Sequence, residues 1–295
     1  MRFILSAIFS LYIIGGSPVI AEQGVYTPFS IGAIADCQFA DQDYVGKRYY
    51  RQSPAKLNKA VIHLNKLNLD YVVHLGDFID TDFQSFEKLL PITNRLTHPL
   101  YHVLGNHDFS VADNKKKQVP EKLNMPARYY SFKHKGWRFI ITDGNDVSMH
   151  GWAKNSSQYA QAVEAHKNQY ADRETWNGAL SETQIKWIKS ELEQAEEADE
   201  KVALYSHFPI YPTNEHNLWN DNDILKLVSS FNVVKLWLNG HNHDGNYDEY
   251  KGIHFLTLKG MVDTKETSYS TIEFGENKIL VRGFGRQESM VLTLK

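Results

Sequence analysis

The sequence predicts an α/β fold, a single domain whose sheets are covered by helices. Apolar runs typical of strands alternate with segments of helical periodicity, and the C-terminal part reads as strand following strand. The chain has 295 residues, 42% apolar and 13% aromatic, which is enough to build a large core. No internal repeat or linker interrupts the pattern, so we expect one domain over residues 22–295.

The elements of the first half follow from apolar runs and helix-start signals. Ser53 and Pro54 offer an N-cap and a proline at the first helical position, and apolar residues recur at helical spacing from there to Leu67. Short apolar runs predict the strands, and a longer periodic segment predicts the second helix. The expected elements are strands at 29–35, 71–75, 100–104 and 138–142, and helices at 53–67 and 82–96.

The second half adds two helices and five strands. Ser181 begins a helix that carries Ile185, Ile188 and Leu192 on one face. The other expected elements are strands at 202–206, 234–238, 253–258, 269–274 and 279–284, and a helix at 221–231. Residues 109–128 and 143–178 show no clear periodicity; their length and aromatic content predict packed lids over a functional site. The aromatic residues in question are Trp152, Tyr159, Tyr170 and Trp176.

The N-terminal residues have the layout of a secretory signal peptide. A basic Arg2 precedes an apolar run over 3–14, and small residues lead up to Ala21. The apolar run is shorter than the roughly 20 residues that span a bilayer. We therefore expect residues 1–21 to be a signal peptide and the mature chain to be secreted or periplasmic, without stable membrane association. The alternative is an uncleaved N-terminal anchor.

Composition narrows the classes of partner. The formal net charge of −3 provides no basic surface for bulk nucleic acid. The single cysteine, Cys37, excludes an intrachain disulfide and a cysteine-based zinc site. There are 13 histidines. His74 and His102 lie within expected strands and are interpreted as packed residues.

Polar side chains that can bind metals follow almost every expected strand of the alternating part. They form five groups: Asp36 and Gln38; Asp77 and Asp80; Asn106, His107 and Asp108; His207; and His241, His243 and Asp244. Ligand sites of α/β sheets lie beyond the carboxyl ends of the strands. Residues spaced i, i+2 on an extended segment point the same way, so each such pair can serve one site. The glycines at 76, 105 and 240 permit close approach of the backbone.

These motifs resemble the calcineurin-like metallophosphoesterase superfamily. The motifs are Asp36-x-Gln38, Gly76-Asp77-x-x-Asp80, Gly105-Asn106-His107-Asp108, His207 and Gly240-His241-x-His243. Within it, the chain is most similar to the manganese-dependent ADP-ribose/CDP-alcohol diphosphatase family. That similarity is carried by residues 35–41, 48–51, 176–178 and 240–245. The resemblance implies a four-layer sandwich, in which helices flank two mixed β-sheets and the active site lies at the carboxyl ends of the strands.

The resemblance also implies a site for two divalent metal ions bridged by Asp77. Asp36, Gln38 and His243 would complete the first site, and Asn106, His207 and His241 the second. Such donors favour Mn²⁺, with Fe²⁺ and Zn²⁺ as alternatives. Many relatives carry a histidine where this chain has Gln38, and a neutral amide is the weaker donor. His107 would donate a hydrogen bond or proton to the phosphate or the leaving oxygen, with Asp108 holding its ring.

Four further residues are candidates for contact with the substrate. Arg48 and Arg51 can grip a phosphate bidentately, although salt bridging near the start of the helix at Ser53 explains them equally well. Cys37 lies between two proposed ligands, where it would shape the pocket or be open to oxidation. Asn177 belongs to one of the matching stretches.

The resulting expectation is a secreted dinuclear-metal hydrolase of a phosphodiester or pyrophosphate bond. Its small substrate would be an ADP-ribose-like or CDP-alcohol-like nucleotide that releases a nucleoside monophosphate. The alternatives are a less selective phosphodiesterase or phosphomonoesterase of the same superfamily and a non-catalytic metal-binding scaffold. The sequence does not indicate an oligomeric state.

Overall fold

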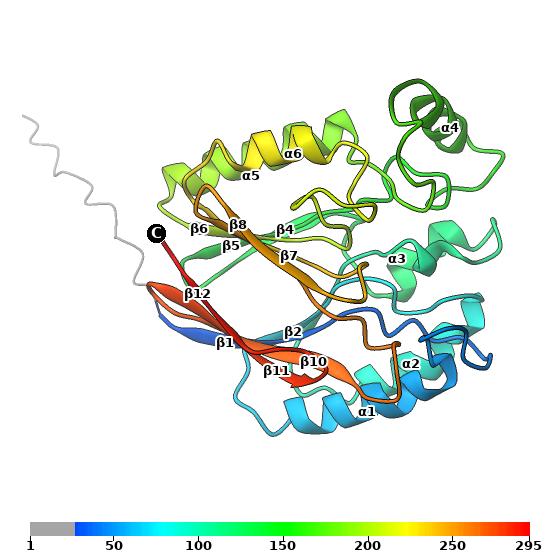
Figure 1. The fold of residues 1–295 in the computed structure, drawn as a ribbon, viewed down its shortest axis with the longest axis horizontal. Coiled ribbons are helices and arrows are strands. Elements are labelled where there is room, and N and C mark those ends of the chain that lie inside the picture. The colour runs from blue at the N-terminus through cyan, green and yellow to red at the C-terminus, as the bar shows by residue number, and fades with distance from the viewer. Residues whose placement is uncertain (1–26) are drawn as a thin grey trace, which may run out of the picture.

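The structure, a computed structural model, describes residues 27–295 (Figure 1). Within this range two six-stranded mixed sheets pack face to face, and helices cover their outer faces. This four-layer α/β arrangement confirms the predicted fold class. The expected signal peptide, residues 1–21, lies outside the described residues.

The first sheet has the strand order β12-β11-β10-β1-β2-β3. Strands β1, β2 and β3 run parallel, and β10, β11 and β12 continue the sheet in antiparallel pairs beyond β1. The strands are β1 (Phe29–Ile34), β2 (Tyr71–His74), β3 (Leu100–His102), β10 (Ser268–Phe274), β11 (Lys278–Gly285) and β12 (Met290–Thr293).

The second sheet has the order β4-β5-β6-β7-β9-β8. Its four central strands β5, β6, β7 and β9 are parallel, and an antiparallel strand closes each edge. The strands are β4 (Tyr130–His134), β5 (Trp137–Ile141), β6 (Lys201–Tyr205), β7 (Val234–Asn239), β8 (Asn246–Tyr250) and β9 (Ile253–Thr257).

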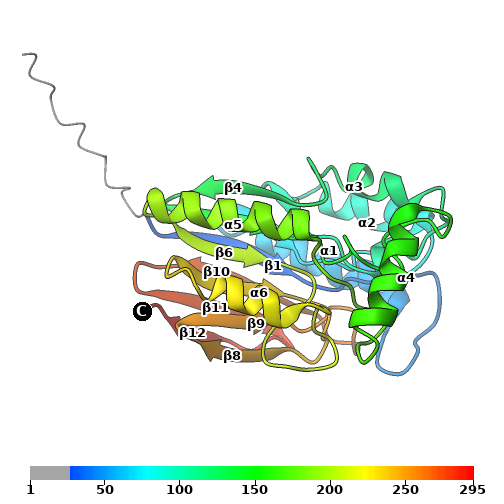
Figure 2. The same cartoon turned by 90° about the horizontal axis from the view of Figure 1, so that it is seen from above.

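Helices cover the outer face of each sheet because both faces of the parallel strands are apolar. The helices are α1 (Ser53–Leu64) and α2 (Phe86–Thr93) on the first sheet, α5 (Glu182–Glu197) and α6 (Asp221–Val228) on the second, and α3 (Val119–Lys122) and α4 (Ser157–Gln169) at one end (Figures 1 and 2). Leu57 and Leu64 of α1 are fully buried, as are Ile188 and Leu192 of α5.

The largest core lies between the two sheets. Ile31 and Val73 of the first sheet meet Phe139, Tyr205 and Leu236 of the second in one buried apolar cluster. This layer fixes the two sheets against each other. As a result, the turns that follow the parallel strands of both sheets come together at the end of the molecule that carries α3 and α4 (Figure 2).

Two helix starts differ from expectation. Residue 52 is the N-cap of α1, and the buried Ser53 is already helical, with no partner for its hydroxyl among the described residues. The segment predicted as a helix over 82–96 begins with a 3-10 turn at Phe83–Ser85 and is α-helical only over Phe86–Thr93. The positive φ of Asp82 (64°) prevents an earlier start.

The sequence pattern did not reveal β4, β8, β12 or α4. The three strands are edge strands that are largely half-buried or exposed, so they lack the apolar runs of the central strands. Helix α4 buries only Ala162 and therefore shows little periodicity. Both segments expected to be lids contain a helix that the sequence pattern did not predict, the short α3 in 109–128 and the longer α4 in 143–178. Among the described residues, no helix is long and apolar enough to cross a membrane.

Candidate metal centre

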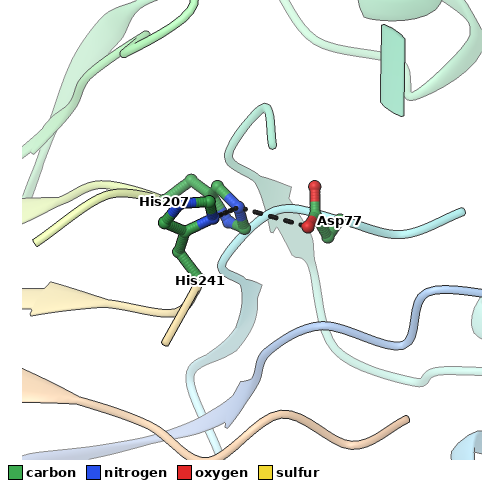
Figure 3. Close-up of side chains that lie close together, drawn as sticks. All are labelled: Asp77, His207 and His241. Carbon is green, nitrogen blue, oxygen red and sulfur yellow. Dashed lines mark hydrogen bonds and ion pairs between the residues drawn. The ribbon is translucent and has the colours of Figure 1, made fainter. Parts of the chain in front are cut away.

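Three side chains from three strand ends meet around the carboxylate of Asp77. Asp77 follows β2, His207 follows β6 and His241 follows β7, and one ligand atom from each lies within 4.8 Å of the others (Figure 3). A second group of Asp36, Asp77 and His243 satisfies the same distance. Asp77 is shared, so the two groups form one centre with two adjoining cation positions.

The backbone at this centre adopts conformations that L-residues seldom take. Asp36, Gln38, Asp77 and His241 all have positive φ, between 46° and 70°. Non-glycine residues in this region are uncommon and tend to occur at functional sites. His241 and His243 serve the same centre, as their spacing predicted, and they fall in the two different groups.

Gly105 allows the turns after β2 and β3 to touch. A Cβ atom at this position would lie 2.2 Å from the backbone nitrogen and Oδ1 of Asp77. The role expected for this glycine, close backbone approach, is therefore realised at the shared carboxylate. Any side chain here would displace Asp77.

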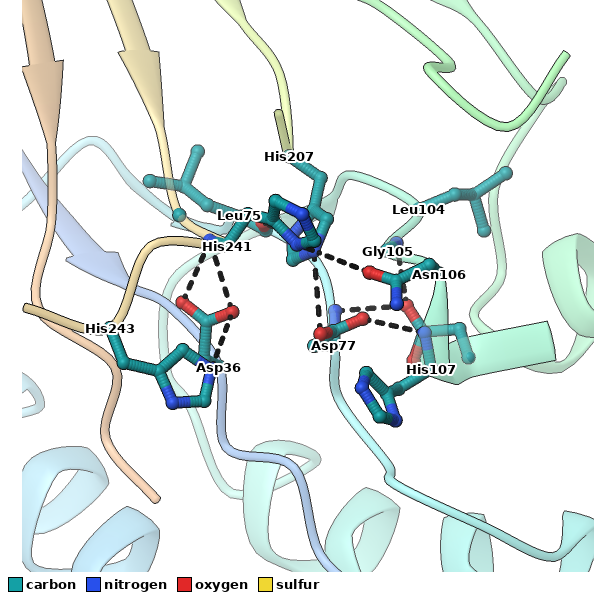
Figure 4. Close-up of polar contacts among 12 residues, drawn as sticks. Asp36, Leu75, Asp77, Leu104, Gly105, Asn106, His107, His207, His241 and His243 are labelled. Atoms are coloured by element: carbon teal, nitrogen blue, oxygen red, sulfur yellow. Dashed lines mark hydrogen bonds and ion pairs between the residues drawn. The ribbon is translucent and has the colours of Figure 1, made fainter. Parts of the chain in front are cut away.

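Asn106 and Gln38 supply amide groups to the same region. The Oδ1 atom of Asn106 is 3.2 Å from Nε2 of His207 (Figure 4). Gln38 is fully buried, its backbone nitrogen donates to the carbonyl of Asp77, and its side-chain amide has no hydrogen-bond partner among the described residues. A buried amide without partners is costly unless a ligand satisfies it.

Each histidine of the centre is oriented by a partner on its other ring nitrogen. Nδ1 of His207 donates to the carbonyl of Leu75 at 2.8 Å. Nε2 of His241 is 2.8 Å from Oδ1 of Asn177, whose Nδ2 donates to the carbonyl of Glu215. Asn177, predicted as a substrate contact, is instead fully buried behind His241. Its role is to orient that ring.

The charges at the centre favour a cation. Burial lowers the pKa of His207, but the carboxylate of Asp77 outweighs burial and raises that pKa to about 9. Burial raises the pKa of Asp77, yet His207 and His107 hold it well below its usual range. Protons on such histidines are the positive charge that a bound metal would replace.

His107 lies beside the centre, and Asp80 holds its ring. The Nδ1 atom of His107 is 3.0 Å from Oδ1 of Asp80, and its backbone N–H donates to Oδ1 of Asp77 at 2.8 Å. Burial lowers the pKa of His107, but Asp77 and Asp80 outweigh burial and raise it above the ordinary value. The side chain is 26% exposed, so the ring is accessible to a ligand.

Asp108 does not hold the ring of His107, contrary to expectation. Its carboxylate accepts the backbone N–H groups of Gly105, Asp77, Phe78 and Ile79, at distances between 2.8 and 3.3 Å. Burial and the nearby Asp77 raise its pKa to about 7. Asp108 therefore connects the turn that bears Asp77 to the turn that bears Asn106. Since backbone N–H groups already occupy both of its oxygens, it is not free to hold the ring of His107.

A cavity of about 300 Å³ opens onto the centre. Its walls are formed by Asp77, Asn106, His107, His241 and His243 together with Arg48, Trp176 and His216. The sequence pointed to Arg48 and placed Trp176 in an expected lid segment, but it did not assign His216 to the site. The ring centroid of Trp176 lies 5.0 Å from that of His216 and 5.2 Å from that of His241. Only the three-dimensional proximity of 176, 216 and 241 identifies this aromatic wall.

Two other predicted substrate contacts do not line the cavity. Arg51 is exposed and forms ion pairs with Asp41, at 2.9 Å, and with Asp43, which matches the salt-bridging alternative. Cys37 is fully buried, with Sγ 3.7 Å from Sδ of Met261, and burial raises the pKa of its thiol. Cys37 points into the core because its neighbours Asp36 and Gln38 face the centre. Its thiol is therefore neither a pocket wall nor an accessible target for oxidation.

The residues present fit two divalent cations. Asp36, Gln38 and His243 would hold one and Asn106, His207 and His241 the other, with Asp77 between them. Carboxylate, amide and imidazole donors without thiolate suit Mn²⁺ and similar ions. When bound, two such ions supply positive charge that activates water and stabilises a phosphoryl group under in-line attack. The fold and this centre together define a dinuclear metal-dependent hydrolase of phosphoric esters or anhydrides.

The chain belongs to the calcineurin-like phosphoesterase family, which it matches over residues 29–245. It is 29% identical to a manganese-dependent ADP-ribose/CDP-alcohol diphosphatase of Arabidopsis thaliana, over 88% of this chain and 96% of that protein. The human protein of the same name is also 29% identical, over 90% and 93% of the two chains. A dimetal phosphatase from Danio rerio has the same fold, with a TM-score of 0.81 and 24% identity over 90% of this chain and 99% of that one.

Removal of divalent cations should abolish activity. With a chelator present, we expect hydrolysis of bis(p-nitrophenyl) phosphate to fall to background. The donors of the centre would then lack the cations that supply the positive charge needed by the reaction. Adding back single metals should restore activity best with Mn²⁺. The measurement is the release of p-nitrophenol alongside metal content by mass spectrometry. Full activity in a chelated, metal-free protein would contradict the dinuclear mechanism.

Proposed function

We propose that this chain hydrolyses the pyrophosphate bond of ADP-ribose-like or CDP-alcohol-like nucleotides. Water would add to one phosphorus, the bond to the bridging oxygen would break, and a nucleoside monophosphate and a second phosphate monoester would be released. The relatives named above support the substrate class. The observation that carries the proposal is a cavity that combines Arg48, the Asp77 centre and the indole of Trp176.

This combination matches the parts of such a substrate. Arg48 lies near Asp77, Asp80 and His107. There its guanidinium can donate two hydrogen bonds to one phosphate. His107 is placed to donate a proton to the leaving oxygen. Trp176 and His216 offer flat faces for a nucleobase at the His241 side of the cavity. Burial lowers the pKa of His216, so its ring tends to be neutral and suited to stacking.

A hydrolysis screen tests the substrate class. The purified protein with Mn²⁺ would be offered ADP-ribose, CDP-choline, cyclic nucleotides and simple phosphomonoesters, and products would be separated by chromatography. We expect the highest kcat/KM on the two diphosphates, with AMP or CMP as product. Equal rates on all substrates would instead indicate a less selective phosphoesterase. No hydrolysis of any substrate by protein containing two metals would indicate a non-catalytic scaffold.

Arg48→Ala should weaken binding of the substrate's phosphates. Loss of a charge-assisted hydrogen bond worth about 1.5–3 kcal/mol predicts a fall in kcat/KM of roughly 10- to 100-fold. The matched control is Arg51→Ala, because Arg51 is three residues away, exposed and outside the cavity. Steady-state kinetics at saturating Mn²⁺ should leave Arg51→Ala close to wild type. Equal losses in both variants would argue against a specific phosphate contact by Arg48.

Trp176→Ala should reduce selectivity for substrates that carry a base. A stacking contribution of about 1 kcal/mol predicts a drop of roughly fivefold in kcat/KM for ADP-ribose. Methyl phosphodiesters, which lack a ring, should be hydrolysed at the wild-type rate. Trp176→Phe, which keeps an aromatic face, should recover most of the loss. A uniform loss on all substrates would assign Trp176 to the support of His241 rather than to base recognition.

We propose in addition that the mature chain is exported. The proposal is supported by the basic start and the apolar run of residues 1–21. Expression of the full chain, followed by fractionation and N-terminal mass analysis, should find a product that begins near Glu22 outside the cytoplasm. A cytoplasmic product that retains Met1 would contradict export.

A further inference from the structure

Asp263, in the segment after β9, contacts one of the candidate metal-binding histidines. Its Oδ1 accepts a hydrogen bond from Nδ1 of His243 at 2.9 Å, and its side chain is fully buried. The opposite ring nitrogen of His243, Nε2, is 3.6 Å from Oδ1 of Asp36. The hydrogen bond to Asp263 therefore fixes the ring so that the lone pair of Nε2 faces the centre. Figure 4 shows the ring of His243 beside the carboxylate of Asp36.

Two lysines hold Asp263 in place. Nζ of Lys47 is 3.3 Å from Oδ2 of Asp263. The buried ammonium of Lys56 donates to backbone carbonyls of the segment 261–264, at 2.6 Å from Met261 and 2.9 Å from both Val262 and Thr264. The carboxylate is thus fixed through both its side chain and its backbone, which is the condition for orienting another group accurately.

Asp263 gives the first cation position a feature that the second lacks among the contacts described. His207 and His241 are oriented by neutral partners, the carbonyl of Leu75 and the amide of Asn177. Of these three candidate ligand histidines, His243 is the one whose far ring nitrogen contacts a carboxylate in the described part of the chain. A carboxylate on the far nitrogen makes an imidazole a stronger donor. The first position is also the one that contains the weak donor Gln38.

We propose that Asp263 is a positioning residue for the first cation position, where its charge compensates for the neutral amide of Gln38. Asp263 orients His243 and strengthens it as a ligand, and Lys47 and Lys56 hold Asp263 for that purpose. The proposal depends on the two-cation centre and not on the identity of the substrate, so failure of the nucleotide screen would leave it intact.

The test is a calorimetric titration of Mn²⁺ into metal-free protein. Wild type should bind two ions. Asp263→Ala should bind one of them 10- to 100-fold more weakly and the other with unchanged affinity. Asp263→Asn keeps a hydrogen-bond acceptor without the charge, so its affinity for the weakened ion should fall between those of wild type and Asp263→Ala. After dialysis at a Mn²⁺ concentration that just saturates wild type, wild type should contain two ions per chain and Asp263→Ala only one.

Asp70→Asn is the matched control. Asp70 also pairs with a histidine and a lysine, His134 at 3.1 Å and Lys135 at 2.5 Å, but it precedes β2 at the other end of the sheet. This variant should bind both ions as wild type does. Two unchanged affinities in Asp263→Asn and Asp263→Ala would overturn the proposal. So would equal weakening of both ions, or the same weakening in Asp70→Asn. If Asp263→Ala fails to fold, the comparison of Asp263→Asn with Asp70→Asn decides.

Discussion

Replacing Asp77 with asparagine should empty both cation positions and abolish turnover. Asp77 is the one carboxylate common to the two ligand groups, and it is 1% exposed. Asparagine has the same shape and can still accept the backbone N–H of His107, so the fold should survive while the shared negative charge is lost. Metal catalysis is worth several kcal/mol, which predicts a fall in kcat of at least about 10³-fold.

Metal content and activity should be measured on the same preparations of this variant. Asp221→Asn is the control, since Asp221 is also 1% exposed and its ion pair with Arg173, at 2.7 Å, involves no ligand of the centre. The control should retain two ions per chain and most of its activity. A variant Asp77→Asn that binds two ions and turns over substrate would show that the two groups do not depend on a shared carboxylate.

His107→Ala should slow turnover by roughly 10²- to 10⁴-fold, the range for loss of a general acid. The metal content should stay at two ions, because the contact of this residue with Asp77 is made by its backbone N–H, which alanine retains. Kinetics on a diphosphate substrate, together with metal analysis, separate these effects. Loss of metal in this variant would mean that the ring is a ligand.

Asp80→Asn is the companion variant for His107. It keeps the ring and an acceptor oxygen but removes the charge 3.0 Å from Nδ1, so the ring loses part of its basicity. We expect a decrease in kcat smaller than that of His107→Ala and no change in metal content. A double variant should be no slower than His107→Ala, since Asp80 acts through that ring. Additive losses would show that Asp80 has a separate role.

The strands that could be predicted from the sequence are those whose burial on both faces requires a run of apolar residues. The parallel strands β1, β2, β6 and β7 are covered on both faces, so each appears as an apolar run. Edge strands contact solvent and carry no such run, as in β8 (Asn246–Tyr250). Their pairing is determined by a neighbouring strand, and the local sequence does not specify it.

Some features of the site could likewise be predicted from the sequence, and others could not. The α/β class and the groups of polar residues after the strands could be predicted from the sequence, because the turns after parallel strands meet at one edge of a sheet. The assignment of these residues to two cation positions came from the resemblance to the metallophosphoesterases. The folded chain was needed to show that Asp80, and not Asp108, contacts the ring of His107 and that Asn177 supports His241. It was also needed to show that His216 and Asp263 lie beside the centre and that the indole of Trp176 lines its cavity. Those contacts depend on φ angles in the left-handed region and on packing between distant segments, which have no local signature in the sequence.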